Sequence, residues 1–374
     1  MMKALNVIGL RGGQYLLIFL LAIATQPLHA QTITIGRGSG IVWEGLPFNA
    51  SLSGGYSGNA AINSWYAMLM ITFNTTQCLG KDDVTTISGY KTFQIAPGVG
   101  LIPRATANAS YNVLDGSVET LSGTLGLPDT IGRTSTGINV GTGSFIKSST
   151  AWCLNVRDDH GSQWVLATRG GYRTVSIKGN WAMVADGNQT SQEIKIPTMY
   201  AASFAGIYLV DTRYQSILPG NITLRISALS CTVATTTNID FGSVQRNSQV
   251  GAELATLSYP LNVSCGQPTD KIDANINVQF SPISGLYNTD SSKLALTQGG
   301  GYITGEIVGV TGSGSCVGTT GLRFNNTQYK LGSITSMEQS KVLNNQITWR
   351  LCSGGASLPT GNVDASAEML VTFN

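Results

Sequence analysis

The sequence predicts an all-β protein made of two β-sandwich domains. Only 11% of its 374 residues are charged, Gly occurs 45 times, and helix-length stretches with a 3.6-residue apolar period are absent. Short apolar or alternating runs are separated by Gly, Asn, Asp and Ser instead, as in residues 65–73, 162–168 and 174–177. Regular short strands between turn signals are typical of a sandwich or barrel.

The first thirty residues have the features of a cleaved secretory signal. Lys3 and Arg11 precede an apolar run over residues 15–25, and Ala30 offers a small residue at the cut. The run is shorter than the roughly 18 apolar residues that suggest a membrane-spanning helix. We therefore expect a secreted chain that begins near Gln31.

Six cysteines then enter an oxidising compartment, where an even number favours three disulfides. Six cysteines allow about fifteen pairings, but their order along the chain favours nearest neighbours: Cys78–Cys153, Cys231–Cys265 and Cys316–Cys352. The alternative, a metal site, lacks a CxxC motif or a Cys/His cluster, and we expect no metal.

The distribution of tryptophan divides the chain. Five of the six lie before the Pro219-Gly220 turn signal, after which Ile222, Leu224 and Ile226 alternate. We place a signal over residues 1–30, a receptor-binding domain over 31–222 and a second domain over 223–374. The exact boundary stays open between about 215 and 230, because strand 222–226 can close one domain or open the other.

The residues for most enzyme chemistry are missing. His29 leaves with the signal, and His160 lies in a polar stretch with Asp158 and Asp159 that is typical of a solvated turn. Paired acids at 82–83 and 158–159 are sequence neighbours, which point to opposite faces of a strand. We expect neither catalysis nor a cofactor, and the net charge of +2 gives no footprint for nucleic acid.

The first domain offers aromatic residues among amides and hydroxyls, in runs 59–66 and 152–155. A sugar presents an apolar face and a rim of hydroxyls, so stacking aromatics and hydrogen-bonding amides suit it. The alternative for each tryptophan is ordinary core packing. The candidate ligand-binding residues are Asn59, Ala60, Trp65, Trp152 and Asn155.

Residues 361–374 alternate as a strand with one buried face. The apolar residues at alternate positions, which form the predicted buried face, are Val363, Ala365, Ala367, Met369, Val371 and Phe373. An unpaired strand edge invites another chain, and a partner's strand is one way to cover it.

The second domain resembles the pilin domain of bacterial chaperone-usher pili. The matching residues are Cys231-Thr232-Val233, the run 239–244 (IDFGSV), and Cys265 as the partner of Cys231. Gly361, fourteenth from the end, and the penultimate aromatic Phe373 match the landmarks of the family's final strand. The pair Cys316 and Cys352 departs from the minimal pattern and leaves the local loop geometry open.

The resemblance implies an incomplete immunoglobulin-like sandwich whose missing strand leaves a hydrophobic groove. A periplasmic chaperone would fill the groove first, and a donor strand from the next pilus subunit would replace it at the outer-membrane usher. The six apolar residues of the final strand would face this groove.

In place of the family's short donor extension, about 195 residues lie between the predicted signal and Cys231. This is the arrangement of two-domain tip adhesins. Trp152-Cys153 and Asn59-Ala60 resemble, loosely, a Trp-Cys pair and an Asn-Ala stretch of N-acetylglucosamine-binding fimbrial lectins. The first hypothesis is a fimbrial tip adhesin that binds host glycans. The alternatives are a structural or capping subunit with a protein or matrix receptor, and a carbohydrate-active enzyme with an immunoglobulin-like appendage.

Overall fold

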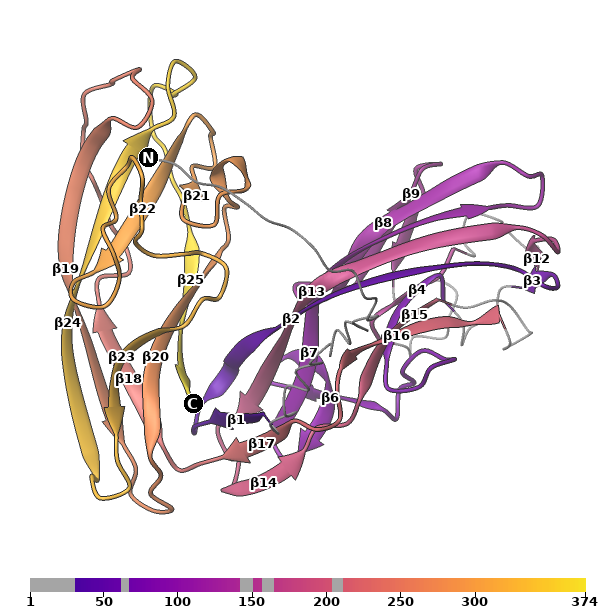
Figure 1. Ribbon diagram of the computed structural model, residues 1–374, viewed down its shortest axis with the longest axis horizontal. Helices are drawn as coiled ribbons and strands as arrows, with labels where there is room; N and C mark the ends of the chain where they lie inside the picture. The colour runs from indigo at the N-terminus through magenta and orange to yellow at the C-terminus, as the bar shows by residue number, and fades with distance from the viewer. Residues whose placement is uncertain (1–30, 62–66, 142–150, 157–164, 204–210) are drawn as a thin grey trace, which may run out of the picture. The chain divides into compact units, whose positions relative to one another are not determined.

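A computed structural model describes residues 31–61, 67–141, 151–156, 165–203 and 211–374 (Figure 1). These residues form strands, turns and loops with very little helix, as the sequence predicts. In this part of the chain no helix is long and apolar enough to cross a bilayer. The predicted signal and the candidates Trp65, His160, Asp158 and Asp159 lie outside the described residues.

The N-terminal domain contains strands β1 to β17. Their bounds are β1 Thr32–Ile35, β2 Ser39–Gly55, β3 Ala60–Ala61, β4 Leu69–Thr72, β5 Val84–Ile87, β6 Tyr90–Ala96, β7 Val99–Asn112, β8 Val118–Gly126, β9 Ile131–Thr134, β10 Asn139–Gly141, β11 Cys153–Leu154, β12 Val165–Ala167, β13 Tyr172–Asp186, β14 Gln192–Lys195, β15 Met199–Ser203, β16 Arg213–Leu218 and β17 Thr223–Ile226.

The large sheet of this domain has the order β10-β9-β8-β7-β13-β2, with β6 paired to β7 and β5 to β6. A smaller sheet has the order β11-β4-β15-β16. Alternation explains the large sheet: in β7, Ala105, Ala107 and Ala109 are buried, whereas Thr106 and Asn108 face solvent. One continuous core joins the buried faces of both sheets. The domain is therefore a sandwich.

The C-terminal domain contains β18 to β25. Their bounds are β18 Ser230–Thr235, β19 Glu253–Gly266, β20 Ala274–Pro282, β21 Leu294–Ala295, β22 Gly301–Ile307, β23 Tyr329–Ile334, β24 Ser340–Ser353 and β25 Ala367–Phe373. One sheet has the order β18-β19-β24-β22-β21, and β25, β20 and β23 are neighbours in another. Leu261 of β19, Phe280 of β20 and Leu351 of β24 share one core, so side chains of both sheets meet between the layers.

Strand β17 pairs with β1 and β14, and Ile222, Leu224 and Ile226 lie in the core of the N-terminal domain. Leu229 lies in a core cluster with Val263 and Ile276 of the C-terminal domain. The two cores thus separate between Ile226 and Leu229.

The three disulfides form in the predicted pairs: Cys78–Cys153, Cys231–Cys265 and Cys316–Cys352. The final strand differs from its prediction, because β25 begins at Ala367 and residues 361–366 are not in a strand. The reason is the partner: β20 ends at Pro282, opposite Ala367. Upstream of that pair the chain bonds to loops instead, with Thr297 N–H donating to the Asp364 carbonyl over 2.8 Å.

Candidate functional site

Strand β25 has one open edge. It pairs with β20 over all of Ala367–Phe373, whereas its other described neighbour, β1, meets it only where Thr34 faces Phe373. The backbones of Asn374 and Asn275 exchange hydrogen bonds of 3.3 and 2.8 Å. Because antiparallel ladders alternate, the N–H and C=O groups of Ala367, Met369 and Val371 point away from β20. This edge can accept another strand.

The apolar side chains of the terminal segment turn to the core of the C-terminal domain but are incompletely covered. Val363, Ala365, Ala367 and Met369 pack against the main core, and Val371 against the smaller one. All five are only partly buried, whereas Phe373 is 7% exposed. A sandwich with its full set of strands would bury such a row, so the row marks a place where a strand is missing.

A groove of 220 Å³ lies at the start of this row. It is lined by Val244, Arg246, Leu254, Leu296, Leu351, Leu358, Pro359, Thr360, Gly361 and Val363. Arg246 is fixed at its rim, since its guanidinium donates to the carbonyls of Leu358 over 3.1 Å and Ala356 over 2.7 Å. The lining is otherwise mostly apolar, which suits an inserted apolar side chain.

Residues 236–250 form no strand, and two of them, Val244 and Arg246, line this groove. Ile239 and Phe241 are half-buried, and Val250 is 69% exposed. The few apolar residues of this mostly polar segment therefore do not cover the core as part of a strand.

The segment before β25 is held in place without a ladder. Asp364 N–H donates to Gln298 Oε1 over 3.0 Å, and Gln298 Nε2 donates to the Asp364 carboxylate over 2.6 Å. Hydrogen bonds from Gln298, and then from Thr297, lower the pKa of Asp364. The Asp364 side chain is therefore held by Gln298, while Val363 of the same segment lines the groove.

Asn59, Trp152 and Asn155, three of the predicted sugar-binding residues, line neither groove described here. Asn59 is exposed, and Ala60 pairs with Ala167. Trp152 is 2% exposed and packs edge-on against Trp181, with ring centroids 6.3 Å apart. Asn155 is 7% exposed. In this structure the Trp152 ring belongs to the core, the alternative that the sequence left open.

A second groove, of 570 Å³, lies on the large sheet of the N-terminal domain, and sequence reasoning missed it. Its polar lining is uncharged and consists of Ser51, Ser53, Asn108, Ser110, Thr120, Ser122, Thr174 and Ser176. Strand pairing puts them in rows: Ser176 faces Ser51 and Asn108, and Thr174 faces Ser53 and Ser110. The sequence signal that could have revealed this groove is the polar residue at every second position of each strand.

A buried arginine ties together one region of the N-terminal domain. Arg173 is 1% exposed and donates to Ser203 Oγ over 2.9 Å, to the Ser203 carbonyl over 3.1 Å and to the Asp211 carbonyl over 2.8 Å. Its guanidinium lies 4.9 Å from the centre of the Tyr56 ring. Burial lowers the pKa of Arg173 and raises that of Tyr56. The Arg173 side chain thus joins β13 to the segments around Ser203 and Asp211.

The C-terminal part of the chain is similar to a known protein family. Residues 220–374 match the family model described as "Fimbrial protein". A search of curated proteins finds no significant match.

Among solved structures, the chain is similar to the P pilus rod subunit PapA at 18% identity, over 38% of this chain and 99% of that one, with a TM-score of 0.27. The CupB6 tip adhesin from Pseudomonas aeruginosa is 15% identical over 90% of this chain and 87% of that one, with a TM-score of 0.27. The CsuC–CsuE chaperone–tip adhesion subunit pre-assembly complex of Acinetobacter baumannii is 11% identical over 92% of this chain and 98% of that one, with a TM-score of 0.23. These TM-scores are too low to carry an argument.

Proposed function

We propose, from the match of residues 220–374 to the fimbrial-protein family model, that the chain is a tip adhesin of a chaperone-usher pilus. The observation that carries the proposal is the open edge of β25 beside an uncovered apolar row and groove. A donor strand inserted there gains main-chain hydrogen bonds to Ala367, Met369 and Val371. Every second side chain of the donor strand enters the groove. Main-chain hydrogen bonds together with such side-chain pockets are how β-strand addition binds a peptide.

The proposed role implies three partners. A periplasmic chaperone occupies the groove during assembly, and the donor strand of the next subunit replaces it at the outer-membrane usher. The protein then resides in a fimbrium at the cell surface. A folded β domain stands before the first cysteine of the fimbrial domain, where a rod subunit carries its donor extension, and this favours the tip.

The N-terminal domain supplies adhesion by binding a host glycan. Two regions are candidates: the residues predicted from sequence, and the groove on the large sheet. The second is better supported, because its eight polar side chains make no side-chain hydrogen bond to any other described residue. An uncharged lining of hydroxyls and one amide favours a neutral glycan over a sialylated or sulfated one.

Leu254→Arg should weaken binding of an extended synthetic peptide with apolar residues at alternate positions. The substitution places a charge in the apolar groove, and we expect the Kd to rise at least about tenfold. Fluorescence anisotropy of the labelled peptide with the mature chain measures this. Val342→Arg, at an exposed site on β24, is the control and should leave the Kd unchanged. Equal affinities for both variants would contradict the proposed groove.

A glycan array probed with the mature chain should show enrichment for neutral glycans. Ser176→Trp fills the groove on the large sheet and should reduce the signal at least about tenfold, whereas Ser216→Trp on β16 should not. Loss with Trp152→Ala alone, in a variant of unchanged stability, would instead favour the site predicted from sequence. No enrichment for any sugar would contradict glycan binding and favour a protein or matrix receptor.

A further inference from the structure

Part of strand β22 in the C-terminal domain is also a sheet edge. This strand pairs with β24 throughout, but with β21 only at Tyr302 and Ile303. Beyond Ile303, the side of β22 that faces away from β24 has no described strand partner. Such an edge, four residues long, is a template for pairing with another chain.

Residues 308–322, here called the edge loop, cover this edge. Leu322 N–H donates to the Gly305 carbonyl over 2.8 Å, and Thr311 N–H donates to the Ile307 carbonyl over 3.0 Å. Ile307 N–H donates to Thr311 Oγ1 over 2.9 Å. The loop thereby satisfies three of the backbone groups that an added strand would need.

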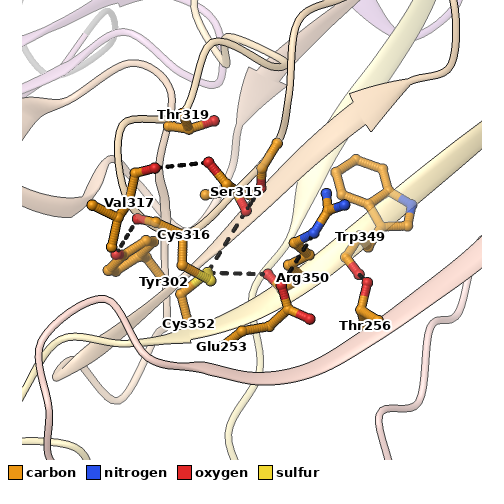
Figure 2. Close-up of a disulfide and its surroundings, with 12 residues drawn as sticks. Glu253, Thr256, Tyr302, Ser315, Cys316, Val317, Thr319, Trp349, Arg350 and Cys352 are labelled. Atoms are coloured by element: carbon orange, nitrogen blue, oxygen red, sulfur yellow. Dashed lines mark hydrogen bonds and ion pairs between the residues drawn. A yellow bond between two sulfur atoms is a disulfide. The ribbon is translucent and has the colours of Figure 1, made fainter.

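The disulfide fixes the edge loop to the sheet (Figure 2). Cys316 of the loop is bonded to Cys352 of β24, and both are buried. Tyr302 Oη donates to the Cys316 carbonyl over 2.8 Å, and Figure 2 shows this contact beside the bridge. The hydroxyl of Thr304 donates to the carbonyl of Gly314 in the loop. The loop is thus held from both β22 and β24.

An ionic group adds to this attachment. Gly314 N–H donates to Glu306 Oε2 over 2.6 Å, and the same carboxylate lies 3.0 Å from Arg350 Nη1. Arg350 Nε also lies 3.2 Å from a carboxylate oxygen of Glu253, as drawn in Figure 2. The hydrogen bond from Arg350 lowers the pKa of Glu306, against the opposing effect of burial. The carboxylate therefore stays ionised and keeps its bond to the loop.

The loop lies against the strand with no space between them. A Cβ added to Gly314 would lie 2.7 Å from the Gly305 carbonyl carbon, and one added to Gly305 would lie 2.7 Å from Leu322 Cδ1. Glycine at 305 and 314 permits this close approach. A further strand could reach β22 only if the loop left.

We propose that the edge loop and its disulfide block strand addition at β22, and that the strand excluded is β22 of a second copy of this chain. Without the loop, two β22 edges can pair antiparallel, because the N–H and C=O groups of Gly305 and Ile307 that point away from β24 can bond to the same groups of a second copy. The device closes the edge of β22 and leaves the edge of β25 open. It goes beyond the proposed function, since it concerns self-association and not donor binding.

The test removes the attachment in the mature chain. Cys316→Ser/Cys352→Ser should self-associate at least about tenfold more tightly in sedimentation velocity, because each freed backbone group can bond to the second copy. The amide of Ile307 should exchange faster when the variant is dilute, because it loses its bond to Thr311, and the amides of Gly305 and Ile307 should both slow on association. Adding Val308→Lys, a charge at an exposed position at the end of the strand, should reverse the association.

Gly314→Val retains the disulfide and displaces the loop sterically, so this variant should also self-associate. It keeps the test decisive if the double cysteine variant does not fold. The matched control, Cys78→Ser/Cys153→Ser, removes a disulfide from the other domain. It should not slow hydrogen exchange at the amides of Gly305 or Ile307. Monomeric behaviour of both loop variants would overturn the proposal, as would association that Val308→Lys leaves unchanged. Binding of the alternating peptide reports separately on β25.

Discussion

Deletion of residues 368–374 is expected to abolish accumulation of folded protein in the periplasm. The deletion removes nearly all of β25 and with it the ladder to β20, from Glu368 facing Ser281 to Phe373 facing Ile276. It also exposes the small core cluster around Ile276 and Val263. Truncating a buried Phe alone costs about 3–5 kcal/mol, a large part of the roughly 5–15 kcal/mol that stabilises a domain.

Periplasmic extracts analysed by immunoblot, with and without the chaperone, measure this loss. Asn374→Ala keeps β25 and is the matched control, which should accumulate like the unchanged protein. Phe373→Ala should give an intermediate level. If the truncated chain accumulated normally without the chaperone, the account of β25 would be wrong.

Arg173→Met should have the largest effect in the N-terminal domain. The substitution leaves the Ser203 and Asp211 carbonyls, both buried acceptors, without their donor. Each unsatisfied buried group costs about 1–3 kcal/mol, so we expect a loss of about 3 kcal/mol in the free energy of unfolding. Arg173→Lys should rescue little, because an ammonium cannot reproduce the planar fork.

Urea denaturation of the mature chain, followed by tryptophan fluorescence, reports mainly on this domain, since five of the six tryptophans lie before residue 215. Arg133→Met, at an exposed position on β9, is the control and should shift the midpoint very little. An unchanged midpoint for Arg173→Met would show that the buried hydrogen bonds contribute nothing.

The features that could be predicted from sequence are those written in local patterns. The alternation of Val371 and Phe373 and the order of the cysteines both correspond to the structure. The start of β25 was predicted six residues early, because strand length depends on where the partner β20 ends, and no local signal states that.

The features that could not be predicted depend on pairing between distant segments. Ser51 and Ser176 become neighbours only through the register of β2 on β13, more than a hundred residues apart. Trp152 has the same neighbours in sequence whether it packs in a core or stacks on a sugar, and only its contact with Trp181 distinguishes the two. The edge loop escaped notice because Gly and Ser runs read as ordinary turns.

Hydrogen exchange on the mature chain, with and without the alternating peptide, tests the central claim most directly. Donor-strand binding at β25 predicts that the amides of Ala367, Met369 and Val371 slow at least about tenfold, while those of Gly305 and Ile307 do not change. Binding of the peptide without protection of these three β25 amides, or protection on β22 instead, would contradict it.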